Sequence, residues 1–429
     1  MKKISKYRLL KWLFLGGSIF IFSRIFPAPP GSPSLSLASP RTIGMAQYPL
    51  ARDDTAPEQN ITNLFNLYSN GIEKIFGKND LVAIKVSASF PEQGYTNSRC
   101  LRVLIEKILN RPGGFNGEIV IFDNIHRPNP DNDLSSGWAA DVLKNNTRNN
   151  GENLNSLIKS FESTGKVFKV HLEDVAINPQ KWVVLNPNSP QYPIPPEGKN
   201  GWIRHRVSIP NSGRDVTLSV PVFRLPNGKI INLSSDGGIY ENGKKTSQPL
   251  KLIIATPLNY HSKYAGVEGA VRAHFGLIEL PGGISQKEGH FEDGSLNLHT
   301  LGYTDNRPEW VGTAIGIYIK QYLYPALYIC CAEWSGFAGT FGAGTAIQTK
   351  VVAICDDPVT IDYYLGKYVL FSCDKSRLWN NPENNFAFGR TLKACFQQGI
   401  GTIDENEMTV LLYDNDNPPT RVHDWIFIQ

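Results

Sequence analysis

Residues 252–276 read LIIATPLNYHSKYAGVEGAVRAHFG and indicate the fold class. The apolar run Leu252–Ala255 is typical of a buried strand, and Thr256-Pro257 predicts its end. A polar turn follows, and then a glycine-punctuated amphipathic segment that we expect to be a helix. Such an order places side chains at the carboxyl edge of a parallel sheet, where open α/β proteins bind ligands. The side chains that this stretch would bring there are Asn259, Tyr260, His261, Lys263, Arg272 and His274.

Strand and helix patterns also alternate before this stretch. Asp80–Ser89 and Glu118–Asp123 are apolar runs that predict strands, and Ser98–Asn110 has one apolar stripe, which predicts a helix between them. The glycines and proline of residues 111–114 would stop that helix. The carboxyl ends of the two strands would bring to one edge Ser87, Ser89, Asp123, Asn124 and His126.

The remaining pattern predicts an α/β fold, a mostly parallel sheet flanked by helices, with a β-rich antiparallel insertion. Residues 124–150 read as a long loop with a short helix at Trp138–Leu143, and Val359–Leu370 reads as a helix. Further strands are expected at Ala326–Ala332, Lys350–Cys355 and Thr420–Gln429. Residues 181–243 alternate polar and apolar positions between Pro-Asn and Asn-Gly turns, which favours hairpins. We expect residues 39–180 and 251–429 to form the two halves of the α/β domain and residues 181–250 the insertion.

The N-terminus, residues 1–38, resembles an export element. Five basic residues within the first eleven precede the apolar run Trp12–Ser23. That run is shorter than the roughly 20 residues of a membrane span but suits a signal-peptide core, and Ser36-Leu37-Ala38 fits a cleavage site. An uncleaved membrane anchor is the alternative, because Arg24 can snorkel and Ile25-Phe26 extends the run. Both readings place the folded part outside the cytoplasm, with the N-terminal segment as its only membrane contact.

Composition narrows the function classes. The chain has 429 residues, of which 41% are hydrophobic and 19% charged, so it can build a large core. Its net charge of +4 is mild, and no run rich in Lys or Arg follows the first eleven residues. Nucleic acid is therefore not an expected partner.

The cysteines do not follow the spacing of a metal or cluster motif. They lie at positions 100, 330, 331, 355, 373 and 395 without a C-x-x-C pair, so we expect no iron–sulfur cluster or zinc ribbon. Cys330 and Cys331 lie in an apolar run, where a thiol behaves as a small hydrophobic group. Core thiols are the favoured interpretation, and one or more disulfides in an exported protein are the alternative.

Three stretches resemble the "domain of unknown function 362" family, whose pattern reads roughly P-K-x-K-x-H and then K-N-x-F-G. Pro257, His261, Arg272 and Phe275-Gly276 fit this pattern. Residues 81–89 resemble the family's early strand, with Lys85 at its lysine, and residues 357–362 (DPVTID) resemble its late D-P-V-A-x-D helix start. The resemblance covers about residues 50–375 and implies an α/β fold but no settled activity. Asn259 replaces a common lysine, Val86 and Ser87 stand where the family has Asn, and the iron–sulfur segment of some members is missing.

These patterns give one candidate site at the sheet edge. We predict that Lys85, His261, Arg272 and Asp357 converge there, although Asp357 before Pro358 also has the position of a helix N-cap. The glycine-rich residues 336–344 could offer backbone N–H groups to an anion. The catalytic candidates are Lys85, His261, Arg272, Asp357 and Asp362, and the ligand-binding candidates are Ser87, Asp123, His126, Gly342 and Gly344.

Three functional classes fit the sequence: an enzyme acting on a small anionic or metal-bound substrate, a non-catalytic exported binding protein, and an envelope interaction protein. Clustered Lys, His and Arg side chains favour an anion as the ligand. Neither the cofactor nor the identity of any metal can be inferred from the residues. His274, one position before the Phe-Gly pair, is interpreted as a packing residue.

Overall fold

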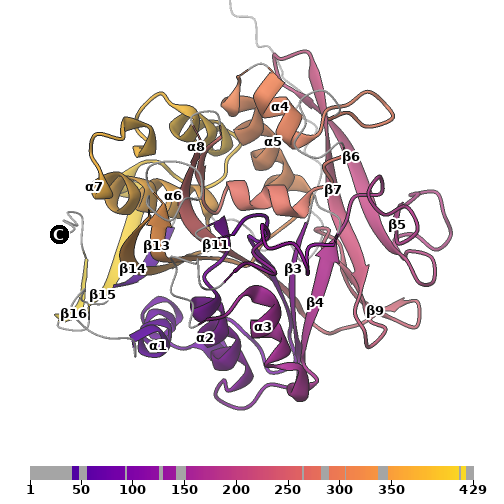
Figure 1. The fold of residues 1–429 in the computed structure, drawn as a ribbon, viewed down its shortest axis with the longest axis horizontal. Coiled ribbons are helices and arrows are strands. Elements are labelled where there is room, and N and C mark those ends of the chain that lie inside the picture. Colours follow the sequence, from indigo (N-terminus) through magenta and orange to yellow (C-terminus); the bar gives the residue numbers. More distant parts are fainter. Residues whose placement is uncertain are drawn as a thin grey trace, which may run out of the picture. The chain divides into compact units, whose positions relative to one another are not determined.

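The computed structural model describes residues 41–47, 56–91, 94–124, 129–141, 151–262, 265–281, 289–304, 306–336, 346–414 and 417–421. These residues form an α/β fold with a ten-stranded sheet, sheet A, and a six-stranded sheet, sheet B. Figure 1 shows helices on both sides of sheet A. Within the described residues, no helix combines the length and the apolar character needed to cross a membrane.

Sheet A contains a central block of parallel strands. Its strands are β1 (Arg41–Gln47), β2 (Leu81–Val86), β3 (Glu118–Asn124), β4 (Val167–Leu172), β11 (Leu250–Ser262), β12 (Gly266–Glu268), β13 (Leu327–Gly336), β14 (Ala346–Cys355), β15 (Met408–Asp414) and β16 (Asn417–Arg421). Their order is β16-β15-β1-β14-β13-β11-β2-β3-β4, and β12 pairs with β11. The neighbours from β13 to β4 are all parallel, whereas β14 is antiparallel to both β13 and β1. The predicted α/β class is thus confirmed, with a mixed sheet.

Helices cover the two faces of sheet A. The α-helices are α1 (Ala56–Ser69), α2 (Ser98–Leu109), α3 (Leu154–Lys159), α4 (Leu298–Thr304), α5 (Pro308–Gln321), α6 (Pro358–Leu365), α7 (Phe371–Cys373) and α8 (Ala387–Gln397). The short 3-10 helices are η1 (Ile72–Lys74), η3 (Glu162–Thr164), η4 (Arg272–Leu277), η7 (Leu378–Asn380) and η8 (Glu405–Glu407), and η6 (Gly366–Leu370) is a π-helix. In Figure 1, α1 to α3 lie below the sheet, and α4 to α8 lie above it.

The strands of the parallel block are apolar throughout because both of their faces are buried. In β2, Leu81 and Ala83 point to the core under α5, α6 and α8, whereas Val82 and Ile84 point to the core under α1, α2 and α3. This alternation follows from the two-residue period of a strand. A strand covered on both faces therefore reads as a continuous apolar run, as the sequence predicted for residues 81–86.

Sheet B is the predicted β-rich insertion. It comprises β5 (Trp182–Val184), β6 (Asn200–Ile209), β7 (Arg214–Arg224), β8 (Ile230–Asn232), β9 (Gly238–Glu241) and β10 (Lys244–Lys245), in the order β10-β9-β8-β7-β6-β5. All neighbours are antiparallel except β5 and β6. The sheet shares a core with sheet A, since the rings of Phe223 and Phe122 lie 5.4 Å apart between centroids.

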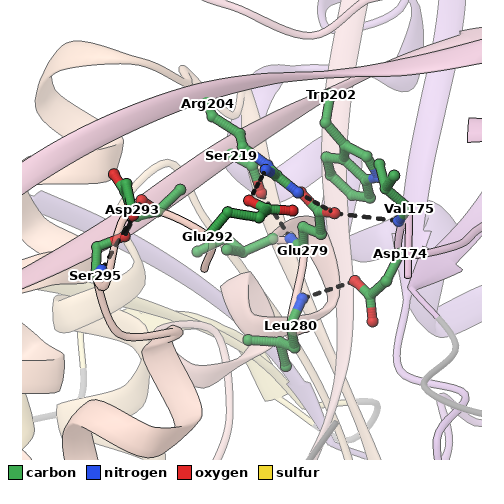
Figure 2. A network of polar contacts seen from close by, with 12 residues as sticks. Asp174, Val175, Trp202, Arg204, Ser219, Glu279, Leu280, Glu292, Asp293 and Ser295 are labelled. Carbon is green, nitrogen blue, oxygen red and sulfur yellow. Dashed lines mark hydrogen bonds and ion pairs between the residues drawn. The ribbon is translucent and has the colours of Figure 1, made fainter. Parts of the chain in front are cut away.

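A polar network fixes sheet B to the segment that follows η4. The fully buried Glu279 accepts two hydrogen bonds from Arg204 of β6, from Nε to Oε2 and from Nη2 to Oε1, both at 2.7 Å. Its Oε1 also accepts from the Val175 N–H at 3.1 Å. Figure 2 shows Glu279 between these partners, with Asp174 accepting from the Leu280 N–H at 2.7 Å. The network compensates a buried carboxylate and positions the chain that leaves η4.

Three local expectations were wrong. β11 does not end at Thr256-Pro257 but continues to Ser262, because the register with β13 shifts between Thr256 and Leu258 and no paired N–H is needed from Pro257. Residues 138–139 form a turn and 140–141 have no regular structure, where a helix was expected, and 142–150 lie outside the described residues. The helix expected after the polar turn is instead the strand β12 followed by the 3-10 helix η4. The helix expected at 359–370 is present, as α6 to Leu365 and then as the π-helix η6.

Several elements were not expected at all. These are the strands β1 and β15 and the helices α1, α4, α5 and α8. The predicted last strand corresponds to β16 in its first two residues, and residues 422–429 lie outside the described part. The proposed export element, residues 1–38, lies outside it as well.

Candidate functional site

Lys85 and Asp123 form a buried ion pair at the carboxyl ends of β2 and β3. Lys85 Nζ lies 3.3 Å from Asp123 Oδ1, and the two side chains are 2% and 1% exposed. The second carboxylate oxygen, Oδ2, accepts a hydrogen bond from the Ala88 N–H at 2.7 Å. Burying two charges is costly unless they are paired and hydrogen-bonded, as these are. The pair therefore places fixed charges beneath the sheet edge.

Gly276 allows η4 to cross directly over this ion pair. A methyl group at this position would lie 2.0 Å from Asp123 Oδ1 and 2.4 Å from Lys85 Cε. No side chain fits in that space, so the close approach requires glycine. Just beyond η4, the Ile278 carbonyl accepts from Asn124 Nδ2 at 2.6 Å, which attaches the segment to β3.

His261 is the extra residue of a β-bulge in the hairpin of β11 and β12. Tyr260 pairs with Val267 and Ser262 pairs with Gly266, so His261 has no opposite residue. Bulges redirect a side chain, and they are frequent next to active sites. Burial, together with the charges of Arg272 and His299, lowers the pKa of His261 to about 3. The imidazole is therefore neutral at physiological pH.

Glu268 is the last residue of β12, the other strand of this hairpin, and it pairs with Asn259 of β11. Glu268 as a whole is partly exposed, but its carboxylate oxygen Oε2 is buried and has no hydrogen-bond partner among the described residues. Burial raises the pKa of Glu268 to about 7, while the charges of Arg272 and Lys85 lower it and that of Asp123 raises it. The charges of Arg272, Lys85 and Asp123 thus all act on the carboxyl group of Glu268. A carboxyl group with a pKa near neutrality can both accept and return a proton.

Arg272 begins η4 and faces a small recess. Its Nη1 donates to the Ala265 carbonyl at 3.1 Å, and its guanidinium lies 4.4 Å from the centroid of the Phe275 ring. Stacking on the Phe275 ring and the hydrogen bond to the Ala265 carbonyl hold the guanidinium in place. The recess is lined by Ala265, Arg272, Phe275, His299, Gly302, Pro308, Val311 and Thr391.

Asp362 holds the segment that connects Glu268 to Arg272. Its two carboxylate oxygens accept from the N–H groups of Ala270 and Val271, at 2.6 and 2.8 Å. Gly269 is required beside it, since a methyl group there would lie 2.4 Å from Asp362 Oδ1. Asp362 is therefore a positioning residue behind the site.

Asp357 caps α6, as its place before Pro358 predicted. Its side chain accepts from the Thr360 N–H at 2.7 Å, and a methyl group on Gly401 would lie 1.9 Å from its Oδ1. Burial raises the pKa of Asp362 to about 7, and the negative charge of Asp357 adds to this rise. In the described part of the chain, the contacts of Asp357 belong to the start of α6 and its neighbours, so its convergence with Lys85 stays a prediction.

Ser87 directly follows the last residue of β2, at the same edge. Its N–H donates to Thr96 Oγ1 at 2.9 Å, and Thr96 Oγ1 in turn donates to the Ala255 carbonyl at 2.7 Å. The Ser87 hydroxyl oxygen is enclosed and has no hydrogen-bond partner among the described residues. The candidates His126, Gly342 and Gly344, together with Lys263, lie outside the described residues.

His274 packs in the core, as expected from its position. Its Nδ1 is 3.0 Å from the Val271 carbonyl, and its Nε2 is 3.3 Å from the Tyr328 hydroxyl. Burial lowers the pKa of His274 to about 4. His274 belongs to η4, and these contacts anchor that helix in the core.

Lys85 and Asp123 form an ion pair, and His261 lies within electrostatic range of Arg272 and His299. Glu268, which sequence reasoning missed, lies within electrostatic range of Arg272, Lys85 and Asp123. The sequence could have pointed to Glu268, because it lies shortly after Gly266 in the stretch 252–276. Only the structure shows that the β11–β12 hairpin places Glu268 at the edge of sheet A. Within the described residues, no three His, Cys, Asp or Glu side chains are arranged to hold a metal ion.

No protein-family model, curated protein or solved structure matches this chain, so the site is argued from its own geometry.

Proposed function

We propose that this chain is an enzyme that transfers a proton to or from a small anionic substrate at the carboxyl edge of sheet A. The observation that carries this proposal is Glu268, whose Oε2 is enclosed without a hydrogen-bond partner among the described residues and whose pKa is about 7. Such a carboxyl group is half ionised near neutral pH, which is the condition for efficient general acid–base catalysis.

The surrounding charges suit an anionic substrate. Arg272 is the group proposed to bind the substrate's carboxylate or phosphate, because a guanidinium offers several donors in one plane. Lys85, held by Asp123, adds positive potential beneath the site. Positive charge near the reacting carbon would stabilise the negative charge that develops when Glu268 removes a proton. His261, neutral at this pH, would orient the substrate by hydrogen bonding.

A binding protein without turnover is the alternative function. It would use the same cations, but an ionisable carboxyl group beside them would weaken anion binding whenever it lost its proton. The presence of Glu268 therefore favours the catalytic proposal. The residues that carry the resemblance to the "domain of unknown function 362" family include Lys85, His261 and Arg272, which supports a functional role for this edge.

Proton transfer can be measured without knowing the full reaction. The purified chain would be incubated in D₂O with small carboxylic acids and phosphate esters, and exchange of carbon-bound protons would be followed by NMR. We expect exchange with at least one carboxylate or phosphate ester, and its loss by about 100-fold or more in Glu268→Gln. Glu197→Gln, which changes an exposed residue, should exchange like the wild type.

The two functions give different results in this experiment. Anion-dependent thermal stabilisation that needs Arg272, without exchange of any compound, would favour the binding protein. Exchange that persists in Glu268→Gln would contradict the role of Glu268.

We also propose that the folded part acts outside the cytoplasm. Support comes from the basic residues 2–11 and the apolar run Trp12–Ser23, which have the order of a signal peptide or an N-terminal anchor. A small anionic substrate from the envelope or the surroundings would be accessible to the protein there.

A further inference from the structure

We propose that a cavity between sheet B and the start of β11 binds a hexuronic acid unit, which is a sugar ring that carries a carboxylate. The cavity has a volume of about 260 Å³, and it is lined by the turn after β8, by β10 and the residues after it, by the start of β11 and by Tyr324. Leu250 is the first residue of β11, so the cavity lies at the amino end of this strand. The site around Glu268 lies at its carboxyl end, and the two proposals are therefore independent.

One wall of the cavity is a tight turn that hydrogen bonds hold in place. The buried Asn232 Oδ1 accepts from the N–H and from the hydroxyl of Ser234, at 2.9 and 2.7 Å. The Ser235 N–H donates to the Tyr322 carbonyl at 2.9 Å, which attaches the turn to the segment after α5. A ligand would find the polar groups of this wall already in position, and such preorganisation lowers the cost of binding.

Lys245 places a positive charge at the cavity. Its Nζ donates to the Asp236 carbonyl at 2.8 Å. Its side chain passes close to Gly238, where a methyl group would lie 2.8 Å from Lys245 Cε. An ammonium group has three donors, so this arrangement leaves donors for a ligand. Within the described residues, no Asp or Glu lines the cavity, and a cation in such surroundings favours a ligand that carries a carboxylate.

The apolar part of the lining suits the C–H surface of a sugar ring. Leu250 and Leu252 contribute aliphatic side chains, and Tyr324, which is 39% exposed, contributes an aromatic ring. The Tyr324 hydroxyl donates to the Lys320 carbonyl at 2.8 Å, so the ring is held at the cavity by its own hydrogen bond. Aromatic side chains offer a large, rigid apolar face, and the C–H groups of a sugar can pack against it.

The polar part of the lining suits the sugar hydroxyls. Thr246 Oγ1 accepts from the Gln248 N–H at 3.3 Å, which uses a lone pair of this oxygen and leaves its proton for a ligand oxygen. A simple carboxylate would engage Lys245 but would leave this hydroxyl and the aromatic ring unused. A neutral sugar would leave the charge of Lys245 without a partner. A sugar acid satisfies both parts of the lining.

Calorimetric titration of the full chain tests the proposal with four probes: methyl glucuronide, methyl galacturonide, the neutral methyl glucoside, and acetate. We expect at least one uronide to bind at millimolar or lower concentration, and at least about tenfold more tightly than methyl glucoside or acetate. The reason is that only a uronide engages both the ammonium group and the apolar surface. If neither uronide binds, or if methyl glucoside or acetate binds as tightly, the proposal is wrong.

Variants of the lining locate the binding. Lys245→Gln should weaken uronide binding about tenfold, because it removes a charge-assisted hydrogen bond, and Tyr324→Ala should weaken it about fivefold. Lys244→Gln is the matched control, since Lys244 is the neighbouring exposed lysine of β10 and does not line the cavity. It should bind like the wild type.

Two outcomes with the variants would overturn the proposal. The first is an equal loss of uronide binding in Lys244→Gln and Lys245→Gln. The second is a loss that appears in Arg272→Gln and not in Lys245→Gln, which would assign the anion to the site of the proposed proton transfer instead. Both lysines are exposed, so both lysine variants should fold, and thermal melting of each variant checks this.

Discussion

At the scale of single residues, the site depends on buried titratable groups and on one close backbone approach. Glu268 Oε2 has no hydrogen-bond partner among the described residues, although two cationic side chains lie within electrostatic range. His261 occupies a bulge and stays neutral. Gly276 has no side chain, which allows η4 to lie directly on the Lys85–Asp123 pair. Each choice costs stability, and such costs are expected where function imposes them.

Replacing Gly276 with alanine should destabilise the protein by about 3 kcal/mol, because the added methyl group overlaps the ion pair of Lys85 and Asp123. Urea unfolding would measure the loss. The control is Gly151→Ala, where the methyl group meets no atom within 4 Å and the cost is limited to about 1 kcal/mol of left-handed backbone strain. Equal losses in the two variants would show that the close approach at Gly276 is unimportant.

The ionisation of Glu268 should make the free energy of unfolding depend measurably on pH. Its pKa is raised from 4.5 to about 7 on folding, mainly by burial. Between these values the folded state binds more protons than the unfolded state, so the contribution of Glu268 to stability falls as the pH rises. The free energy of unfolding of Glu268→Gln, relative to that of the wild type, should therefore rise steadily from about pH 4.5 to about pH 7. Urea titrations at several pH values would measure it.

The exposed variant Glu197→Gln is the control, and its difference from wild type should be flat over the same range. His261 titrates in the opposite sense, because its pKa is lowered on folding, but it is present in both proteins and cancels from the comparison. A flat difference for Glu268→Gln would indicate that Glu268 is ionised normally in the folded state.

At the scale of elements, the attachment of sheet B can be tested with two arginines of β6. Arg204→Ala should cost about 3 to 5 kcal/mol, because it leaves the fully buried Glu279 without its cation. Arg206, two residues further along, pairs with Asp215 and Asp293 but is 50% exposed, so Arg206→Ala should cost much less than Arg204→Ala. Chemical denaturation of both variants tests the difference. Similar costs would mean that the Figure 2 network does not hold the sheets together.

Elements with strong local patterns were predictable from the sequence. β2 and β3 are covered on both faces and read as continuous apolar runs, and α2 shows one apolar stripe and the N-cap Asn97. β11 was predicted too short, because Pro257 resembles a strand end unless the register shift beside it is known. β1 has a weak pattern and depends on partners far along the chain. Glu268 was missed for a similar reason, since its role depends on the hairpin that brings it back to the edge.

At the scale of the whole molecule, the order of residues 2–38 predicts that everything from about residue 39 onward lies outside the cytoplasm. An alkaline phosphatase fusion after Ala38 or near Asp54 should be active in a bacterial host, because the enzyme matures only after export. A fusion that lacks residues 2–23 should be inactive and serves as the control. A full-length fusion that is inactive, although it is expressed, would exclude export.

The place of β1 in sheet A has a consequence for the time course of synthesis. The first described strand lies between β14 and β15, which are made some three hundred residues later. A ribosome delivers the N-terminal strand first, yet its two neighbours appear only when the polypeptide is almost complete. We therefore expect the nascent chain to stay open until its last strands emerge. A chain that completes its sheet this late stays unfolded during synthesis, and passage through a membrane channel requires an unfolded chain.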